Sequence, residues 1–176
     1  MFDTSIFNFI DMHDLYSYIE YFFTQNKDIS VYICDTQVQD ISAISDSLKK
    51  DRLEKMMQNI SVQTIHASLG FVGIDETSPH KHGYKSGRVD KVKVANINEG
   101  KPEEIEKLKD DKADTTILDT AVTEDIDYLI TRDRIMKTRL PERLKKVRIY
   151  SKKHPELNIE LIKEKEDLMN FLNGLL

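Results

Sequence analysis

The sequence predicts an α/β domain in which helices flank a central, mostly parallel sheet of about four or five strands. Short apolar runs alternate along the chain with longer segments that have one apolar face, as at 128–131 and 114–124. Strands that alternate with helices are typical of parallel sheets, because each crossover needs a long connection. The 176 residues are enough for one domain with its own core, so we expect a single domain over 1–176.

Composition argues against several other classes of protein. Apolar residues make up 39% of the chain and charged residues 32%, which is typical of a globular protein. The net charge of −5 does not by itself indicate a nucleic-acid-binding protein. The single cysteine, Cys34, cannot form an intramolecular disulfide, which suits a cytoplasmic location. No apolar run approaches the roughly 20 residues of a membrane-spanning helix, so we expect no membrane partner.

The N-terminal part of the chain predicts two strands and two helices. A short strand is expected over 1–7 and a second over 29–33 (ISVYI), a β-branched and aromatic run. Between them, apolar residues at helical spacing predict a helix over 12–24. Thr36 is a suitable N-cap for one long helix that reaches about residue 60.

Residues 61–100 form a glycine-rich insertion within the domain. Two short alternating pieces, 69–74 and 89–97, flank a polar tip at 75–88, and this pattern predicts a β-hairpin. Pro102 then suits the first turn of a short charged helix that ends near residue 109.

The C-terminal part alternates again between helix and strand. The pattern predicts a helix over 114–124, a strand over 128–131, a second strand over 147–151 and a final helix near 164–173. A strongly basic segment, 132–153, follows the first of these strands.

Four aspartates are expected to meet at one edge of the sheet. Asp3 follows the first strand, and Asp133 follows the strand at 128–131. Asp114 opens a helix, and Asp40 lies about one turn into the helix after the second strand. Parallel strands point their carboxyl ends at the same edge, where the helices that follow them begin and where ligands of open α/β sheets bind.

Converging carboxylates favour a particular chemistry. They remain ionised together only if cations neutralise them, and oxygen-only sites suit Mg²⁺ or Mn²⁺. Such ions support hydrolysis of phosphodiester bonds. Taken singly, each acid has a simpler interpretation: Asp114 as a helix N-cap, Asp133 as a turn residue, Asp40 as a solvated helix position, and Asp3 as a residue of no particular role.

The segments that carry these acids resemble the PIN-domain ribonucleases. The resemblance rests on residues 3–7 (DTSIF), 35–42 (DTQVQDIS), 114–121 (DTTILDTA) and 127–134 (DYLITRDR), of which the last two, at their separation, are the most specific. It implies a PIN-like fold that cleaves RNA with Mg²⁺ or Mn²⁺. It also implies that the metal ligands and catalytic acids are Asp3, Asp40, Asp114 and Asp133, with Ser5 and Thr131 as polar residues that hydrogen-bond near them.

Two further expectations concern partners. The basic segment 132–153 predicts contacts with RNA phosphates, and a solvated surface is an equally good interpretation. The candidate RNA-binding residues are Arg132, Arg134, Lys137 and Arg139.

Two other functions stay open. One is a catalytically inactive PIN-fold module that binds RNA or a protein, because Asp40 stands where glutamate is commoner. The other is a toxin paired with an antitoxin-like protein, and a homodimer is a further alternative.

Overall fold

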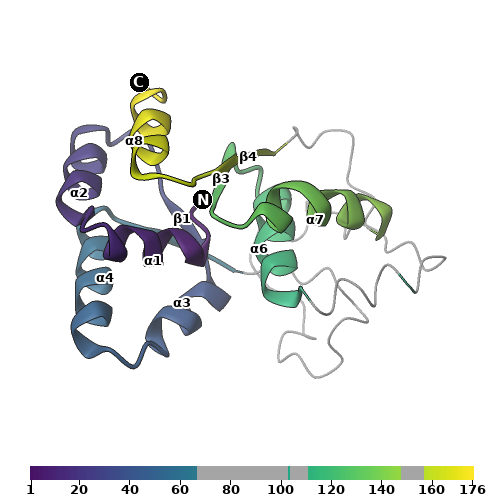
Figure 1. The fold of residues 1–176 in the computed structure, drawn as a ribbon, viewed down its shortest axis with the longest axis horizontal. Coiled ribbons are helices and arrows are strands. Elements are labelled where there is room, and N and C mark those ends of the chain that lie inside the picture. The colour runs from purple at the N-terminus through teal and green to yellow at the C-terminus, as the bar shows by residue number, and fades with distance from the viewer. Residues whose placement is uncertain (67–102, 104–110, 148–156) are drawn as a thin grey trace.

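The computed structural model describes residues 1–66, 103, 111–147 and 157–176, and these form a mixed α/β arrangement (Figure 1). The strands are short and parallel. In the first part of the chain the elements are α1 (Thr4–Met12), α2 (Tyr16–Gln25), β1 (Tyr32–Cys34), α3 (Asp35–Ser42), α4 (Ser47–Asn59) and β2 (Gln63–Ile65). In the second part they are α6 (Lys112–Thr123), β3 (Tyr128–Thr131), α7 (Arg134–Val147), β4 (Asn158–Leu161) and α8 (Lys165–Asn173).

The first three residues join two small parallel sheets. β1 pairs with β2, and β3 pairs with β4. The Phe2 amide donates to the Tyr32 carbonyl at 3.1 Å, and the Asp3 amide donates to the Ile130 carbonyl at 2.9 Å. The Ile130 amide in turn donates to the Met1 carbonyl at 2.9 Å. The extended N-terminus therefore lies between β1 and β3, and Asp3 reaches the carboxyl end of β3.

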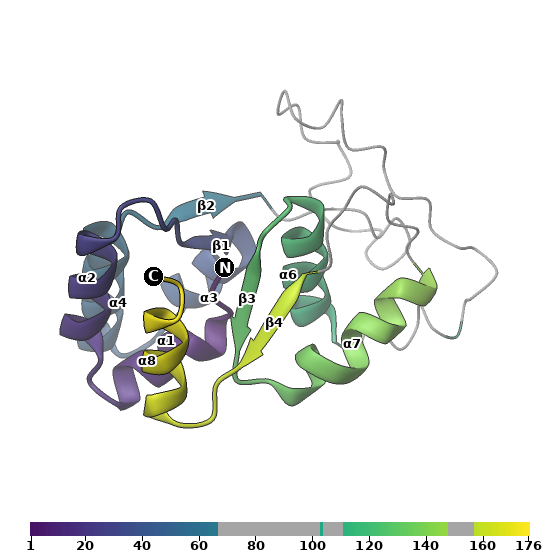
Figure 2. The ribbon, with the colours of Figure 1, turned by 90° about the horizontal axis from the view of Figure 1, so that it is seen from above.

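Helices cover both sides of β3 (Figure 2). In that view α6 and α7 lie on one side of β3 and β4, and α1, α2, α4 and α8 lie on the other. Leu129 belongs to the buried group formed with α6 and α7, whereas Ile130 belongs to the larger group formed with α1, α2, α4 and α8. Because β3 is buried on both faces, its apolar run is continuous rather than alternating.

The expected strand over 1–7 is wrong beyond Asp3, because α1 begins at Thr4. Residues at helical spacing in this segment are all buried, namely Ile6, Phe7, Phe9 and Ile10. The expected helix over 12–24 is also divided differently. α1 ends at Met12, Asp14 adopts a positive φ of 49°, and α2 begins at Tyr16.

The single long helix expected from Thr36 to about residue 60 is likewise wrong. α3 ends at Ser42 and α4 begins at Ser47. Asp46 caps the second helix, because its side chain accepts a hydrogen bond from the Lys49 amide at 3.1 Å. The break lets α3 and α4 point in different directions, which Figure 1 shows.

The C-terminal predictions agree better with the structure. The helix expected at 114–124, the strand at 128–131 and the helix near 164–173 are confirmed to within two residues by α6, β3 and α8. The basic segment forms α7, which includes Val147, so the strand expected over 147–151 is wrong at its first residue. β4 was not predicted.

Some predictions fall on residues outside those described. These are the hairpin pieces at 69–74 and 89–97, the helix over 102–109 apart from residue 103, and the rest of the strand over 147–151. Within the described ranges, no helix combines the length and the apolar character that crossing a membrane requires.

Candidate functional site

Asp3 is a buried carboxylate held by two hydroxyl groups. Asp3 is only 3% exposed and occupies the N-cap position of α1, yet its side chain makes no capping hydrogen bond. Instead Oδ2 accepts hydrogen bonds from Ser5 Oγ at 2.5 Å and from Thr131 Oγ1 at 2.8 Å. Oδ1 accepts no hydrogen bond from the described part of the chain. One hydroxyl comes from α1 and the other from β3, so the orientation of Asp3 depends on both elements.

Asp133 follows the end of β3 at Thr131 by two residues and directly precedes α7. Its amide donates to Thr131 Oγ1 at 2.9 Å, and its Oδ1 accepts from the Ile135 amide at 2.6 Å. The side chain is therefore a cap of α7 as well as a neighbour of Thr131. Asp133 can both cap α7 and take part in a site, because Oδ1 accepts the capping hydrogen bond and Oδ2 remains for another interaction.

Asp114 lies in the first turn of α6 and is close to both of these acids. Partial burial, followed by the negative charges of Asp3 and Asp133, raises the pKa of Asp114 to about 6. A hydrogen bond with the Asp133 carboxyl and the charge of Asp111 act in the same direction. Asp40 is more exposed, and its pKa is raised by partial burial and by the charge of Asp3.

The four predicted acids thus interact electrostatically at one edge of the sheet. We call Asp3, Asp40, Asp114 and Asp133 the acid group. Asp3 interacts with Asp40 and Asp114, and Asp114 interacts with Asp133. Asp3, Asp114 and Asp133 lie at the starts of α1, α6 and α7, where the unpaired N–H groups favour negative charge. In Figure 2 the end of β3 lies beside the start of α1 and leads into α7.

The donor atoms of the acid group are all oxygens, which fits Mg²⁺ or Mn²⁺ better than the softer metals. Among the described residues, no three His, Cys, Asp or Glu side chains are already arranged to hold a metal ion. Carboxylates that lie near one another without a counter-ion favour the uptake of a proton, and the raised pKa of Asp114 has this direction.

We predict that Asp114 makes a contribution to the stability of the metal-free protein that grows as the pH falls from 7 to 5, and that this contribution is visible as the difference between the wild type and Asp114→Asn, because the buried Met1 amine, whose pKa is lowered to about 5, acts in the opposite direction in both proteins. An acid whose pKa is higher in the folded state than in the unfolded state, here about 6 against 3.8, binds more protons when folded. Its contribution is complete below 3.8 and is lost as the pH rises through about 6. A shift of this size is worth about 3 kcal/mol at most, and screening of the half-exposed side chain reduces it to about 1–2 kcal/mol.

Urea unfolding at several pH values, with EDTA present, measures this gain. In Asp114→Asn the side chain at this position cannot titrate. Between pH 7 and pH 5, the change in the free energy of unfolding should therefore be less favourable in this variant than in the wild type by about 1–2 kcal/mol. Equal pH dependence in the two proteins would contradict the placement of Asp114 beside the other acids.

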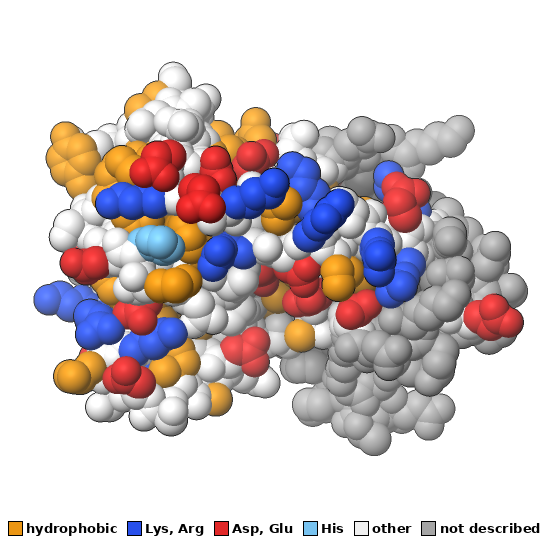
Figure 3. All heavy atoms as spheres, in the orientation of Figure 1, with side chains coloured by type: hydrophobic (Ala, Val, Ile, Leu, Met, Phe, Trp, Pro, Cys, Tyr) orange, Lys and Arg blue, Asp and Glu red, His pale blue; other side chains and the backbone are white. Residues whose placement is uncertain are grey.

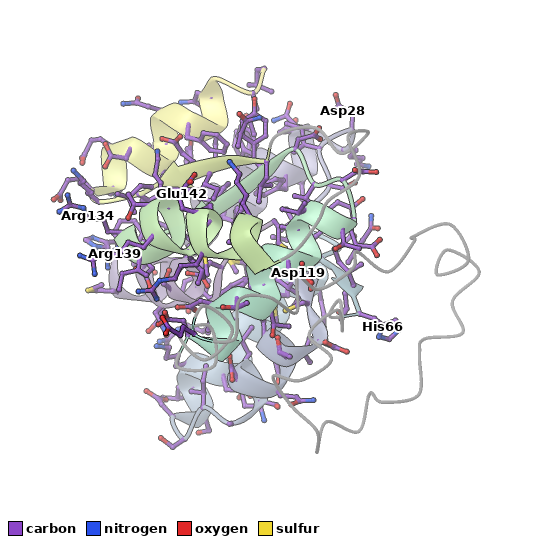
Figure 4. All side chains as sticks on the ribbon, turned by 90° about the vertical axis from the view of Figure 1, so that its right-hand side faces the viewer. Asp28, His66, Asp119, Arg134, Arg139 and Glu142 are labelled. Atoms are coloured by element: carbon purple, nitrogen blue, oxygen red, sulfur yellow. The ribbon has the colours of Figure 1, made fainter. Side chains whose placement is uncertain are left out.

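Exposed basic side chains follow Asp133 along α7. In the centre of the face in Figure 3, acidic side chains lie beside a row of Lys and Arg side chains. In Figure 4, Arg134 and Arg139 project from α7 on the same side of the molecule, and His66 lies on the opposite side. No ion pair joins any of the four predicted RNA-binding residues to a carboxylate among the described residues: Arg132, Arg134, Lys137 and Arg139.

Gln37 supports the site and was missed in the sequence. Its side chain is fully buried; Nε2 donates to the Phe2 carbonyl at 2.8 Å, and Oε1 accepts from the Cys34 amide at 2.9 Å. Gln37 therefore fixes the peptide that precedes Asp3 to the end of β1. A signal was present, because Gln37 precedes the buried Ile41 by one helical turn and so lies on the apolar face of the helix.

Comparison of the chain with models of protein families, with curated proteins and with solved structures finds no significant match. The functional argument therefore depends on the geometry of this chain.

Proposed function

We propose that the protein is a metal-dependent endoribonuclease that hydrolyses RNA phosphodiester bonds at the acid group. One observation carries the proposal: the buried carboxylate of Asp3, held by two hydroxyl groups, lies near enough to Asp114 to raise the pKa of that acid, and Asp133 acts on Asp114 in the same direction. Carboxylates gathered at the start of three helices destabilise one another at neutral pH, and a function that requires a cation accounts for this cost.

Each acid has a distinct task in this proposal. Asp3 and Asp133 are held in place by the protein, through Ser5, Thr131 and the first turn of α7, so each presents a fixed oxygen to an ion. Asp114, whose pKa is raised to about 6, would lose its proton on binding a cation and so become a ligand. Asp40, at the exposed rim, completes the oxygen donors directly or through water.

A bound Mg²⁺ or Mn²⁺ would supply the activation of water and the stabilisation of the leaving oxygen. The protein supplies the positions: Asp133 directly precedes α7, which carries the exposed cations Arg134, Lys137 and Arg139. Phosphate groups of RNA match these cations, and such contacts position a strand without selecting its bases.

The PIN-like fold is part of the same proposal. Two features of the sheets support it: the strands are parallel, and the N-terminal segment lies between β1 and β3. The order along the chain also supports it, because α6 with Asp114 is followed by β3, which ends at Thr131, and then by Asp133. The segment between β2 and α6 would then be an insertion of this particular chain.

The test is a cleavage assay with purified protein. End-labelled single-stranded and hairpin RNAs are incubated with Mn²⁺, with Mg²⁺ or with EDTA. We expect internal cleavage products with either metal and none with EDTA. Intact RNA under every metal condition, from folded protein, would contradict the proposal.

A second candidate function is a module that binds RNA or a protein partner without cleaving. The observation that favours it is that no metal-binding arrangement is already formed among the described residues. Calorimetric titration with Mn²⁺ separates the two, because a binding module shows no Mn²⁺ site that depends on Asp3 and Asp114. A homodimer and an antitoxin-like partner stay predictions, which light scattering and the neighbouring genes test.

A further inference from the structure

Arg132 is held in one orientation by three contacts. Its amide donates to Ser5 Oγ at 3.0 Å, and its guanidinium carbon lies 4.5 Å from the centre of the Phe9 ring. A guanidinium N–H donates to the Lys163 carbonyl at 3.4 Å. Phe9 is buried in α1 and Lys163 follows β4, so the side chain crosses from β3 towards α1 and the start of α8.

This environment differs from that of Arg52 and Arg143, which pair with carboxylates. Arg52 donates to Asp11 at 2.6 Å, and Arg143 donates to Asp111 at 3.0 Å. Arg132 is exposed and has no carboxylate partner within the described ranges. Among the described residues it uses one guanidinium N–H, so a planar edge of the guanidinium remains available.

The position of Arg132 is fixed relative to the acid group. Ser5 Oγ accepts from the Arg132 amide and donates to Asp3, so a single hydroxyl connects the two residues. The neighbours of Arg132 along the chain, Thr131 and Asp133, both take part in the hydrogen bonds of the site. The guanidinium packs on Phe9 of α1, whereas Arg134, Lys137 and Arg139 belong to α7.

We propose that Arg132 is a binding subsite for a phosphate of the RNA that neighbours the phosphate at the acid group. The guanidinium presents two parallel N–H groups to one phosphodiester, a geometry that a lysine cannot reproduce. Stacking on Phe9 fixes the plane in advance, so little side-chain freedom is lost on binding. The strand then extends from α7 on one side of the acids to Arg132 on the other. This inference rests on the proposed function for its substrate.

The test measures RNA binding in EDTA, where no metal-dependent cleavage occurs. Fluorescence anisotropy of a labelled single-stranded RNA compares the wild type with Arg132→Lys, Arg132→Ala and Lys27→Ala. Lys27 is exposed and adjoins Asp28, which Figure 4 shows on the side opposite Arg134, so Lys27→Ala is a charge-matched control for Arg132→Ala.

We expect Arg132→Lys to weaken binding about tenfold although the net charge is unchanged, because a charge-assisted hydrogen bond and the stacked orientation are lost. Arg132→Ala should bind at least as weakly and should reduce the salt dependence by about 0.7 in slope. Lys27→Ala should bind as the wild type does. Circular dichroism verifies that each variant is folded.

Binding by Arg132→Lys equal to that of the wild type would overturn the subsite, because a general positive field tolerates lysine. Absence of RNA binding by the wild type would overturn it as well. If the wild type cleaves no RNA but binds it in an Arg132-dependent manner, the subsite stands and the proposed nuclease function fails, so the two failures are distinguishable.

Discussion

Asp114→Asn is expected to reduce Mn²⁺-dependent RNA cleavage at least about 100-fold while leaving the fold intact. The amide has nearly the same shape as the carboxyl group but carries no negative charge, so the ion loses a ligand. Asp114 is the most informative of the four acids. Asp3 is almost fully buried and Asp133 caps α7, so loss of activity in their variants would combine structural and chemical effects.

The same substitution should raise the stability of the metal-free protein at pH 7, because it removes a carboxylate that other carboxylates repel. The measurement is a gel-based cleavage assay together with a thermal melt in EDTA. Asp51→Asn is the matched control, since Asp51 is an exposed acid of α4 that makes no ion pair within the part of the chain that the structure describes. Wild-type cleavage by Asp114→Asn, or equal loss in Asp51→Asn, would contradict the assignment of the site.

Gln37→Met is expected to lower the free energy of unfolding by about 2–4 kcal/mol. Methionine has a similar volume, so no large cavity forms. The Phe2 carbonyl and the Cys34 amide, however, each lose a buried hydrogen-bond partner. Since the Phe2 carbonyl directly precedes Asp3, the variant should also lower Mn²⁺ affinity by more than the loss of stability explains.

Urea unfolding and Mn²⁺ titration, both performed where the variant is folded, measure these two effects. Gln39→Met provides the control: Gln39 is exposed on the same helix, and the change should shift stability by less than about 0.5 kcal/mol. A Gln37→Met protein as stable as the control would show that these two hydrogen bonds do not hold the N-terminus against β1.

The segment from α6 to the start of α7 could be predicted well because its signals are local. Consecutive turns of α6 bury Ile117, Leu118 and Ala121, and the short β3 has the buried apolar pair Leu129 and Ile130 at its centre. The spacing of apolar residues along the sequence is enough to predict a helix and a strand of this kind. Asp114 and Asp133 then follow as residues at the start of a helix and after a strand.

The N-terminal segment could not be predicted in the same way. Three residues are too few to show a strand by periodicity, and Met1–Asp3 becomes extended only because the backbones of β1 and β3 offer hydrogen bonds on both sides. The apolar residues that follow suit either a strand or a helix when taken alone, and the burial of α1 against α2 and α4 decides between them.

The proximity of the acids depends on contacts between distant residues. The bond from Thr131 to Asp3 joins residues that are 128 positions apart, and no local pattern encodes it. The sequence did contain the residue types, Asp-Thr-Ser at one end and Thr-Arg-Asp at the other. The role of Gln37 is non-local for the same reason, since its partner Phe2 lies 35 positions away.

The central claim is that Asp3, Asp114 and Asp133 bind a divalent ion together. Crystals soaked in Mn²⁺ and measured at a wavelength where manganese scatters anomalously test this claim most directly. We predict an anomalous peak about 2.0–2.5 Å from oxygens of Asp3 and Asp114, with Asp133 as a further ligand directly or through water. A clear map with no peak between these side chains, or with manganese bound only elsewhere on the surface, would contradict the claim.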